Sequence, residues 1–350
     1  MRRISNRVNV GGVIIGGGED VTVQSMTNTK TSDKEATLAQ LIRLRDAGCD
    51  IARFTVNDFE AVKSIAYFKE RVEMPLVADI HYDYRLALES VRAGIDKIRI
   101  NPGNIGGDDK VKAVCDACAK KGIPIRVGVN AGSLEKEILR KYSSPTPEAV
   151  AESARLSCER LESFGFSDIV VSVKASGVRE MMSANRIIAK SLPYPIHLGV
   201  TEAGAGQAAL VKSAVGIGAL LADGIGDTVR VSLTGDAVKE VEAALDILNS
   251  LGLRPHIEFI SCPTCGRTQI DLEEQVRKLK EKLCGLKVKS TIKVAVMGCA
   301  VNGPGEAAEA DVGVAGGKGE AILFVKGKIT GKIPEGKIAD VLYEEIRKLT

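Results

Sequence analysis

Eight short runs of β-branched and other apolar residues recur between residues 20 and 235, and charged segments with helical periodicity separate them. A strand followed by a helix, repeated eight times, predicts a parallel sheet closed into a (β/α)8 TIM-type barrel. An open, doubly wound sheet is the alternative, but eight units within about 215 residues favour the barrel. The predicted strands are Val21–Met26, Ile51–Val56, Leu76–Ile80, Lys97–Asn101, Ile125–Val129, Ile169–Ala175, Ile196–Thr201 and Thr228–Leu233.

Two further segments flank the predicted barrel. Arg7–Ile15 is predicted to form a hairpin with Gly11-Gly12 at its turn, and this hairpin can plug the bottom of the barrel. Leu251–Pro255 is typical of a linker, so we predict a barrel domain over residues 1–250 and a small α/β domain over residues 251–350. The elements predicted in the second domain are Ile257–Ile260, Leu272–Leu283, Thr291–Met297, Ala310–Val314, Ala321–Val325 and Ile338–Leu349.

Charge and composition exclude several classes of protein. Basic residues number 48 against 45 acidic ones, a net charge of +3, which argues against a general nucleic-acid or membrane-surface binder. Trp is absent and aromatic residues make up 4%, so base-stacking platforms are not expected. Apolar runs are only strand-length, and no apolar core follows the basic N-terminus, so we expect neither a membrane span nor a signal peptide and predict a cytoplasmic protein.

Three cysteines in the second domain have the spacing of a metal centre. Cys262 and Cys265 form a Cys-x-x-Cys turn directly after one predicted strand, and Cys299 follows another. A structural zinc site normally has a fourth Cys or His, whereas a [4Fe–4S] cluster with three thiolates keeps one iron for a weaker ligand or a substrate. Glu306 is the nearest carboxylate that can reach back to that iron. We therefore predict a redox-active [4Fe–4S] cluster, with a zinc site or a thiol redox pair as alternatives.

The remaining cysteines of the 8 in the chain are predicted to be structural. In a reducing cytoplasm they are expected to be free thiols rather than disulfides. Cys115 and Cys118 repeat the Cys-x-x-Cys spacing, but they lie within a predicted helix, Asp108–Lys121, that contains no turn residues. Cys49, Cys158 and Cys284 lie in helices or at helix ends, so the same interpretation applies to them.

Polar side chains recur on one face of the predicted barrel strands. Residues two apart on a strand share a face, and this rule places a cation on the inward face of each of five strands. These cations are Arg53, Arg99, Arg126, Lys174 and Arg230, and their polar neighbours are Asp79, His81, Asn101, Asn130 and Ser232. Any single one could be a structural ion pair, but burying all five unpaired would cost several kcal/mol each. We interpret the group as a site for a polyanion such as diphosphate, at the C-terminal mouth of the barrel.

Glu202 lies just past the seventh predicted strand, among these cations. We expect it to be a proton donor or to bind a substrate hydroxyl, with a salt bridge to Arg230 or Lys174 as the alternative. His81 and His197 are candidates for hydrogen bonds to substrate oxygens, or equally for satisfied interior histidines. The inward carboxylates Asp79 and Glu202 are too few to neutralise five cations.

The two domains together resemble the 4-hydroxy-3-methylbut-2-enyl diphosphate synthase family of the non-mevalonate isoprenoid pathway, and the resemblance covers the whole chain. No extra domain separates the barrel from the cluster domain, so the chain is similar to the short bacterial form. Each motif alone is modest support, but all of them in order are specific. The motifs are Val23–Asn28, Asp79–His81, Arg99–Asn104, Arg126–Asn130, His197–Gly204, Ser261–Arg267 and Asn302–Glu306.

The resemblance implies a reaction and a set of site residues. It implies the two-electron reductive ring opening of 2-C-methyl-D-erythritol 2,4-cyclodiphosphate, with loss of water, to 4-hydroxy-3-methylbut-2-enyl diphosphate. It also implies that Cys262, Cys265, Cys299 and Glu306 ligate the [4Fe–4S] cluster. The substrate contacts it implies are Arg53, Arg99, Asn101, Arg126, Asn130, Lys174, Glu202 and Ser232. Glu202 and Glu306 are the expected catalytic residues, because one can protonate the leaving oxygen and the other is an exchangeable ligand.

The same resemblance implies partners. It implies a homodimer in which the cluster domain of one subunit caps the barrel of the other, with a ferredoxin or flavodoxin as electron donor. The cluster domain also resembles modules of sulfite and nitrite reductases, but a half domain of that kind needs a fourth cluster Cys and a sirohaem pocket. The sequence is also compatible with a pterin- or phosphate-binding barrel that carries a structural zinc module, and with a cluster-based iron or redox sensor. A sensor would leave the five inward cations unexplained.

Overall fold

The chain folds into two compact units. The first ends at Leu251, and the second begins at Gly252. This computed structural model describes residues 2–283 and 285–350, so the interpretation of Cys284 as a structural thiol lies outside the described residues. Each unit contains its own sheet and its own buried core.

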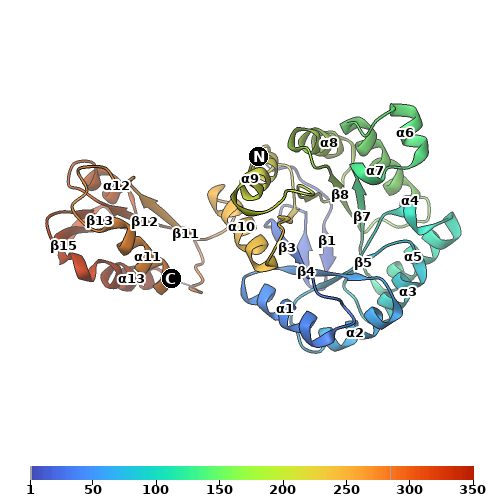
Figure 1. Ribbon diagram of the computed structural model, residues 1–350, viewed down its shortest axis with the longest axis horizontal. Coiled ribbons are helices and arrows are strands. Elements are labelled where there is room, and N and C mark those ends of the chain that lie inside the picture. Colours follow the sequence, from blue (N-terminus) through green and yellow to red (C-terminus); the bar gives the residue numbers. More distant parts are fainter. Residues whose placement is uncertain (1, 284) are drawn as a thin grey trace. The chain divides into compact units, whose positions relative to one another are not determined.

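In the first unit a parallel sheet forms the predicted barrel (Figure 1). The described residues give it eight strands in the order β8-β7-β6-β5-β4-β3-β10-β9, and a parallel bridge between Val171 and Ile196 brings the two ends of that order together. The strands are β3 (Thr22–Met26), β4 (Ile51–Val56), β5 (Leu76–Ile80), β6 (Lys97–Ile100), β7 (Ile125–Asn130), β8 (Ile169–Lys174), β9 (His197–Leu198) and β10 (Thr228–Val229). The outward side chains, such as Phe54 and Ile98, are apolar and fully buried, because helices cover the outer face of the sheet.

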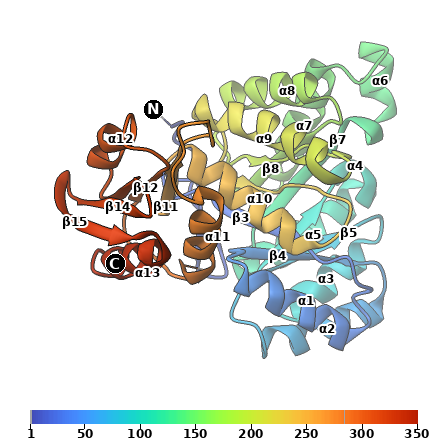
Figure 2. The same ribbon diagram turned by 60° about the vertical axis from the view of Figure 1, so that its left-hand side comes forward.

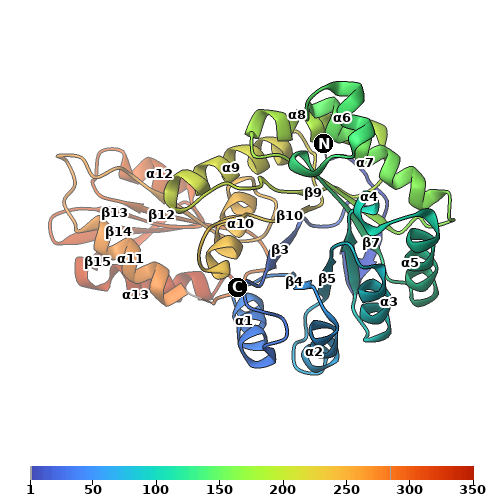
Figure 3. The same cartoon turned by 45° about the vertical axis from the view of Figure 1, so that its right-hand side comes forward.

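Helices surround the barrel and alternate with its strands (Figures 1 and 3). Aspartates begin several of them: Asp33, Asp58 and Asp83 each accept a hydrogen bond from a backbone N–H of the first turn. The helices are α1 (Lys34–Asp46), α2 (Phe59–Lys69), α3 (Tyr84–Arg92), α4 (Pro102–Ile105), α5 (Asp108–Lys121), α6 (Lys136–Tyr142), α7 (Pro147–Glu162), α8 (Val178–Ser191), α9 (Gly206–Ala222) and α10 (Ala237–Ser250). Because strands and helices alternate, the carboxyl ends of all the strands meet at one edge, where barrel sites lie.

The predicted N-terminal hairpin covers the opposite end of the barrel. β1 (Val8–Val10) pairs antiparallel with β2 (Val13–Ile15), and Gly11 and Gly12 form the turn with φ of 56° and 98°. Side chains of the hairpin pack against residues at the beginning of barrel strands. This apolar plug consists of Val8, Val10, Ile15, Ile51, Val77 and Val170. The structure therefore confirms that the hairpin closes the bottom of the barrel.

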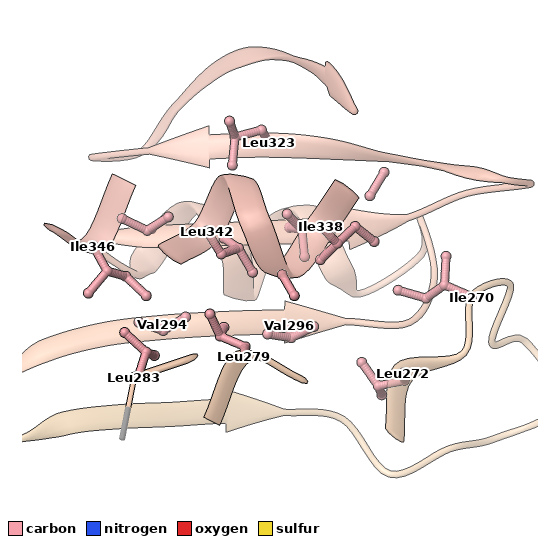
Figure 4. Close-up of a cluster of buried hydrophobic side chains, with 14 of the residues drawn as sticks. Ile270, Leu272, Leu279, Leu283, Val294, Val296, Leu323, Ile338, Leu342 and Ile346 are labelled. Carbon is pink, nitrogen blue, oxygen red and sulfur yellow. The ribbon is translucent and has the colours of Figure 1, made fainter. Parts of the chain in front are cut away.

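The second unit is a mixed five-stranded sheet with helices on both faces (Figures 2 and 3). Its order is β11-β12-β13-β14-β15, with β11 to β13 parallel and the last two strands antiparallel to their neighbours. The strands are β11 (Ile257–Ser261), β12 (Ile292–Met297), β13 (Val312–Gly316), β14 (Glu320–Val325) and β15 (Lys328–Pro334), and the helices are α11 (Leu272–Leu283), α12 (Gly303–Glu309) and α13 (Ile338–Arg347). Leucines and isoleucines of α11 and α13 form the core with β12 to β14 (Figure 4). Because β11 and β12 are parallel neighbours, the loops that follow them start at the same edge of the sheet.

Several elements differ from the prediction. β9 and β10 have 2 residues each, where six were predicted, because the chains separate after the Arg230 N–H donates to the Leu198 carbonyl at 2.9 Å. β15 was not predicted, since its mostly exposed residues show no apolar alternation. α12 was not predicted either, since it begins with Gly303, Pro304 and Gly305, which are typical of a turn.

Candidate active site

Basic side chains line the interior of the barrel, as the alternation along the strands predicted. Arg53 on β4, Arg99 on β6, Arg126 on β7 and Lys174 on β8 are 9%, 6%, 1% and 8% exposed. Arg230 directly follows β10, and its side chain is 19% exposed. The strand register sets Arg99 beside Arg126 and Asn130 beside Lys174. The five predicted cations therefore share one interior.

Asp79 on β5 is the carboxylate at the centre of part of this group. One carboxylate oxygen lies 3.1 Å from Nη1 of Arg99 and the other 3.8 Å from Nε of Arg53. His81 places its Nε2 3.6 Å from the same carboxylate and 3.2 Å from Arg99. Burial acts to raise the pKa of Asp79, but Arg53, the hydrogen bond with His81 and Arg99 hold it well below its usual range. Asp79 is therefore ionised, and it positions Arg53 and Arg99. A dianion can bind beside Asp79 only if these arginines screen the negative charge of the carboxylate.

Arg126 and Lys174 are not paired with a carboxylate in this way in the described residues, although Asp79 acts on Arg126 from a greater distance. Among the described residues neither forms an ion pair, and Arg126 donates one hydrogen bond, from Nη1 to Gln24 Oε1 at 3.3 Å, while its Nε has no partner. Burial lowers the pKa of both groups well below the ordinary value, and the neighbouring cations Arg53 and Arg230 lower it further. Buried positive charge without a partner in the protein favours an anionic ligand.

Glu240 on α10 is a second buried carboxylate, which sequence reasoning did not find. It is 3% exposed and accepts hydrogen bonds from Nε and Nη2 of Arg230 at 3.1 and 2.9 Å. Its oxygens also accept from Ser25 Oγ at 2.8 Å and from the Leu233 N–H at 3.0 Å. Arg230 in turn donates to Ser232 Oγ at 2.6 Å. Glu240 therefore positions both Arg230 and the loop that carries Ser232.

Two glycines give the cations room. A Cβ on Gly128 would lie 2.5 Å from Nε of Arg99, and a Cβ on Gly199 would lie 2.8 Å from Nζ of Lys174. Both glycines occupy inward-facing positions, so a side chain at either one would displace a cation. The interior is thus shaped by missing side chains as well as by charged ones.

The predicted amides lie at the carboxyl ends of their strands. Asn101 is buried and accepts a hydrogen bond from the Gly103 N–H at 3.1 Å, which makes it the N-cap of α4. Arg160 on α7 holds this turn by donating to the carbonyls of Pro102 and Gly106 at 2.7 and 2.9 Å. Asn130 is the last residue of β7 and is partly exposed.

Glu202 lies on the loop after β9, and its exposed side chain forms no ion pair within the described part of the chain. The alternative of a salt bridge from Glu202 to Arg230 or Lys174 is therefore not observed, and Arg230 pairs with Glu240 instead. Glu202 has φ of 53°, in the left-handed region that favours glycine. The structure leaves its carboxylate available to a ligand at the rim.

His197 is an interior histidine whose hydrogen-bonding groups are only partly satisfied. It is fully buried, its Nδ1 lies 3.4 Å from Thr228 Oγ1, and its Nε2 has no partner in the described residues. Burial, with Arg126 and Lys174 nearby, lowers the pKa of His197 well below its ordinary value, so the ring is neutral. His81, in contrast, lies at the partly exposed end of the site, beside Asp79 and Arg99.

Three cysteines of the second unit, Cys262, Cys265 and Cys299, lie on two loops at one edge of its sheet. Cys262 directly follows β11 and accepts a hydrogen bond from the Gly298 N–H, with 3.3 Å between nitrogen and sulfur. Cys299 comes next after Gly298, and Glu306 lies on α12, seven residues further along the same connection. Among the described residues no group of three His, Cys, Asp or Glu side chains is spaced to hold a metal ion.

The chemistry of these thiols nevertheless fits a thiolate-ligated cluster. Hydrogen bonds from the backbone of Val301 and Asn302 lower the pKa of Cys299, and hydrogen bonds from Arg267 lower that of Cys265. Cys265 is exposed, and so is Glu306. Soft thiolates held by backbone N–H groups are the donors that iron–sulfur clusters use.

The four described cysteines outside these loops, Cys49, Cys115, Cys118 and Cys158, are buried. Cys115 and Cys118 lie on α5, and burial raises the pKa of Cys115 to about 11 and that of Cys118 further. Burial likewise raises the pKa of Cys49 to about 12 and shifts Cys158 upward. Protonated, inaccessible thiols of this kind are structural.

Comparison with known proteins follows the same division of the chain. Residues 5–245 match the family domain described as the GcpE TIM-barrel domain, and residues 258–348 match the GcpE protein C-terminal domain. Among solved structures, 3-dehydroquinate dehydratase from Geobacillus kaustophilus has a TM-score of 0.52 and 15% identity, and covers 71% of this chain and 99% of that one. A truncated 3-deoxy-D-arabino-heptulosonate 7-phosphate synthase from Thermotoga maritima also has a TM-score of 0.52, at 15% identity, and covers 71% of this chain and 94% of its own. At these identities the likeness shows the barrel fold alone.

Curated relatives extend over the full chain. A protein of Clostridium perfringens is 52% identical over 349 residues, which is 99% of both chains. One of Clostridium acetobutylicum is 53% identical over 348 residues, again 99% of each. Both are named 4-hydroxy-3-methylbut-2-en-1-yl diphosphate synthase (flavodoxin). With both domains matched and relatives of this identity along the whole length, the chain belongs to the GcpE family.

Proposed function

We propose that this protein is a 4-hydroxy-3-methylbut-2-enyl diphosphate synthase. It would reduce 2-C-methyl-D-erythritol 2,4-cyclodiphosphate with two electrons, open the cyclic diphosphate and release a hydroxyl oxygen as water. The observation that carries the proposal is the excess of buried cations in the barrel over the carboxylates Asp79 and Glu240. A diphosphate supplies the missing negative charge, and its oxygens suit the planar guanidinium groups. The curated relatives are named for the same activity.

The residues of the barrel have distinct roles in this proposal. Arg126 and Lys174, which form no ion pair within the described residues, bind the diphosphate oxygens. Arg53 and Arg99, already oriented by Asp79, extend that contact. Further contacts at the rim are proposed for His81, Asn101, Asn130, Arg230 and Ser232. The exposed carboxyl of Glu202 is proposed to protonate the leaving oxygen.

In the second unit, we propose that Cys262, Cys265, Cys299 and Glu306 hold a [4Fe–4S] cluster. When bound, such a cluster supplies electrons one at a time and a Lewis-acidic iron. Glu306 is proposed as the exchangeable ligand, because a carboxylate holds iron less tightly than three thiolates do. The lowered pKa values of Cys265 and Cys299 support this ligand set, since thiolates are the ligating form.

The direct test is turnover. Anaerobically reconstituted protein with a chemical reductant should convert the cyclodiphosphate to the linear allylic diphosphate, followed by mass spectrometry. Iron and sulfide analysis accompanies it: Cys265→Ser should lose both iron and activity, while Cys115→Ser, a buried thiol on α5, should keep them. Zinc without sulfide, or a fully loaded protein that leaves the substrate unchanged, would exclude the proposal.

We also propose an electron donor, a cellular location and an oligomeric state. The electron donor is a flavodoxin, as the names of the relatives indicate, or a ferredoxin. No helix in the described part of the chain is long and apolar enough to cross a membrane. We propose a cytoplasmic enzyme that acts as a homodimer, with the cluster domain of one subunit covering the barrel of the other.

Mixed dimers test that arrangement. One subunit would carry Cys265→Ser and the other Arg126→Met, so that each has a single damaged unit. If the cluster domain acts on the partner's barrel, the mixed dimer contains one intact pair of units and recovers up to half of the wild-type activity. If the units act within one chain, neither pair is intact and the mixture stays inactive.

A further inference from the structure

Lys97 is a buried cation that the proposed mechanism does not use. It is the first residue of β6, it is fully buried, and its Nζ has no hydrogen-bond partner among the described residues. In the strand register it lies opposite Val77, a residue of the apolar plug, so both side chains face the barrel interior. Arg99, two residues further along β6, shares that face closer to the mouth. Lys97 therefore lies beneath the proposed diphosphate site.

The charged groups that shift the pKa of Lys97 are basic. Arg126 of β7 and Arg53 of β4 act on its amine, and His197 of β9 lies close enough for Lys97 to affect the ring. The inward carboxylate of the neighbouring strand, Asp79 of β5, lies beside Arg99 in the register and is paired with Arg99 and Arg53. Burial lowers the pKa of Lys97 well below the ordinary value, and Arg126 and Arg53 lower it further. Because the amine of Lys97 is fully buried and has no hydrogen-bond partner among the described residues, the free protein favours its neutral form.

We propose that Lys97 takes up a proton from solvent when the diphosphate substrate binds above it, and so becomes a further cation of the site without touching the ligand. This inference rests on the proposed function. The physical reason is that burial is the main cost of an ammonium group at Lys97, that Arg126 and Arg53 add to this cost, and that a bound dianion offsets the fields of these two arginines. The amine then gains a proton, and no bond to carbon, oxygen or phosphorus changes.

The sign of the pH dependence follows. Proton uptake occurs at pH values between the pKa of Lys97 in the free protein and its higher pKa in the complex. Substrate affinity is therefore greatest below the first of these and falls as the pH rises through the second. Lys97 is not a catalytic residue: its ammonium group attracts the bound dianion across the barrel interior without touching it.

Calorimetry measures this proton directly. The cyclodiphosphate is titrated into oxidised protein without reductant, so that binding occurs without turnover, in buffers of different ionisation enthalpy at pH 8. Each phosphorus of the cyclic ligand carries one strongly acidic oxygen, so the ligand does not titrate there. We expect the wild type to take up about one proton that Lys97→Met and Lys97→Gln do not. Lys63→Met, an exposed lysine on α2 paired with Glu60, should keep the wild-type uptake.

The outcomes separate this inference from the proposed function. Binding by the wild type without proton uptake overturns the inference and leaves the function intact, whether or not the variants fold. Unchanged uptake in either folded Lys97 variant also overturns it. Absence of any binding by the wild type overturns the inference and the proposed function together.

Discussion

At the scale of single residues, Glu240 shows how a helix can define a site inside a sheet. Its carboxylate accepts hydrogen bonds from Arg230, Ser25 Oγ and the Leu233 N–H. Glu240→Gln would leave Arg230 buried without its counter-charge, and we expect a loss of about 3 kcal/mol in the free energy of unfolding. Urea denaturation followed by tyrosine fluorescence measures it. Glu242→Gln, an exposed position on the same helix, should leave the midpoint unchanged; equal midpoints for the two variants would contradict the role given to Glu240.

Arg126 should respond in the opposite way. It is 1% exposed and forms no ion pair among the described residues, so its guanidinium destabilises the free protein. We expect Arg126→Met to keep or increase the stability of the fold and to weaken binding of the cyclodiphosphate by about 10- to 100-fold, the loss of a charge-assisted hydrogen bond. Calorimetry and urea denaturation on the same sample measure both quantities. Arg92→Met, on the exposed side of α3, is the control; an Arg126 variant that loses stability while binding normally would argue for a structural role.

At the scale of elements, the features that depend on local alternation were predictable and those that depend on packing between elements were not. The period of two identified Arg53 and Arg99 because both lie on regular strands whose outer faces are apolar. By the same rule Lys97 shares the inward face with Arg99. Its burial was not predicted, because it is the first residue of the strand. Glu240 gave no signal, because helical periodicity places it on the buried face of α10 without saying which cation it meets.

The cysteine loops depend on a close approach between neighbouring strands of the second unit. A Cβ on Gly316, at the end of β13, would lie 2.8 Å from the carbonyl oxygen of Gly298, the residue before Cys299. We expect Gly316→Ala to displace that loop and to lower the iron and sulfide bound per chain at least several-fold. Gly331→Ala on β15 is the matched control, since a Cβ there meets nothing within 4 Å. Equal iron content in the two variants would show that the loop tolerates the shift.

At the scale of the whole molecule, the net charge of +3 conceals an uneven distribution. The surface is rich in ion pairs, whereas the barrel interior holds more cations than carboxylates. Burial and the neighbouring cations lower the pKa values of the interior lysines Lys97 and Lys174. The barrel is therefore arranged for an anion that is not part of the chain. The pH dependence that its buried lysines give to stability should be opposite to the one that a surface lysine paired with a carboxylate gives.

The direction of that dependence can be worked out. Lys97 and Lys174 have lowered pKa values in the folded protein, whereas the unfolded chain binds their protons up to a pKa of about 10.4. Between those values the unfolded state holds more protons, so the free energy of unfolding rises with pH, by about 1.4 kcal/mol per pH unit for each lysine that is neutral only in the folded state. Above about pH 8.5 the buried thiols act the other way, because Cys49 and Cys115 stay protonated in the fold while unfolded thiols ionise.

We therefore expect the stability of the barrel to increase from pH 7 to pH 8, a range in which unperturbed carboxylates no longer titrate. Urea denaturation followed by tyrosine fluorescence reports mainly on this unit, since every tyrosine except Tyr343 precedes residue 251 and Trp is absent. Lys97→Met should reduce the slope with pH, and it should raise the stability at pH 7, because folding then no longer has to release the proton that the unfolded chain holds on Lys97. A stability that is flat or falls over this range, or a slope that the substitution leaves unchanged, would mean that Lys97 keeps its proton in the folded protein and that an unseen counter-charge balances it.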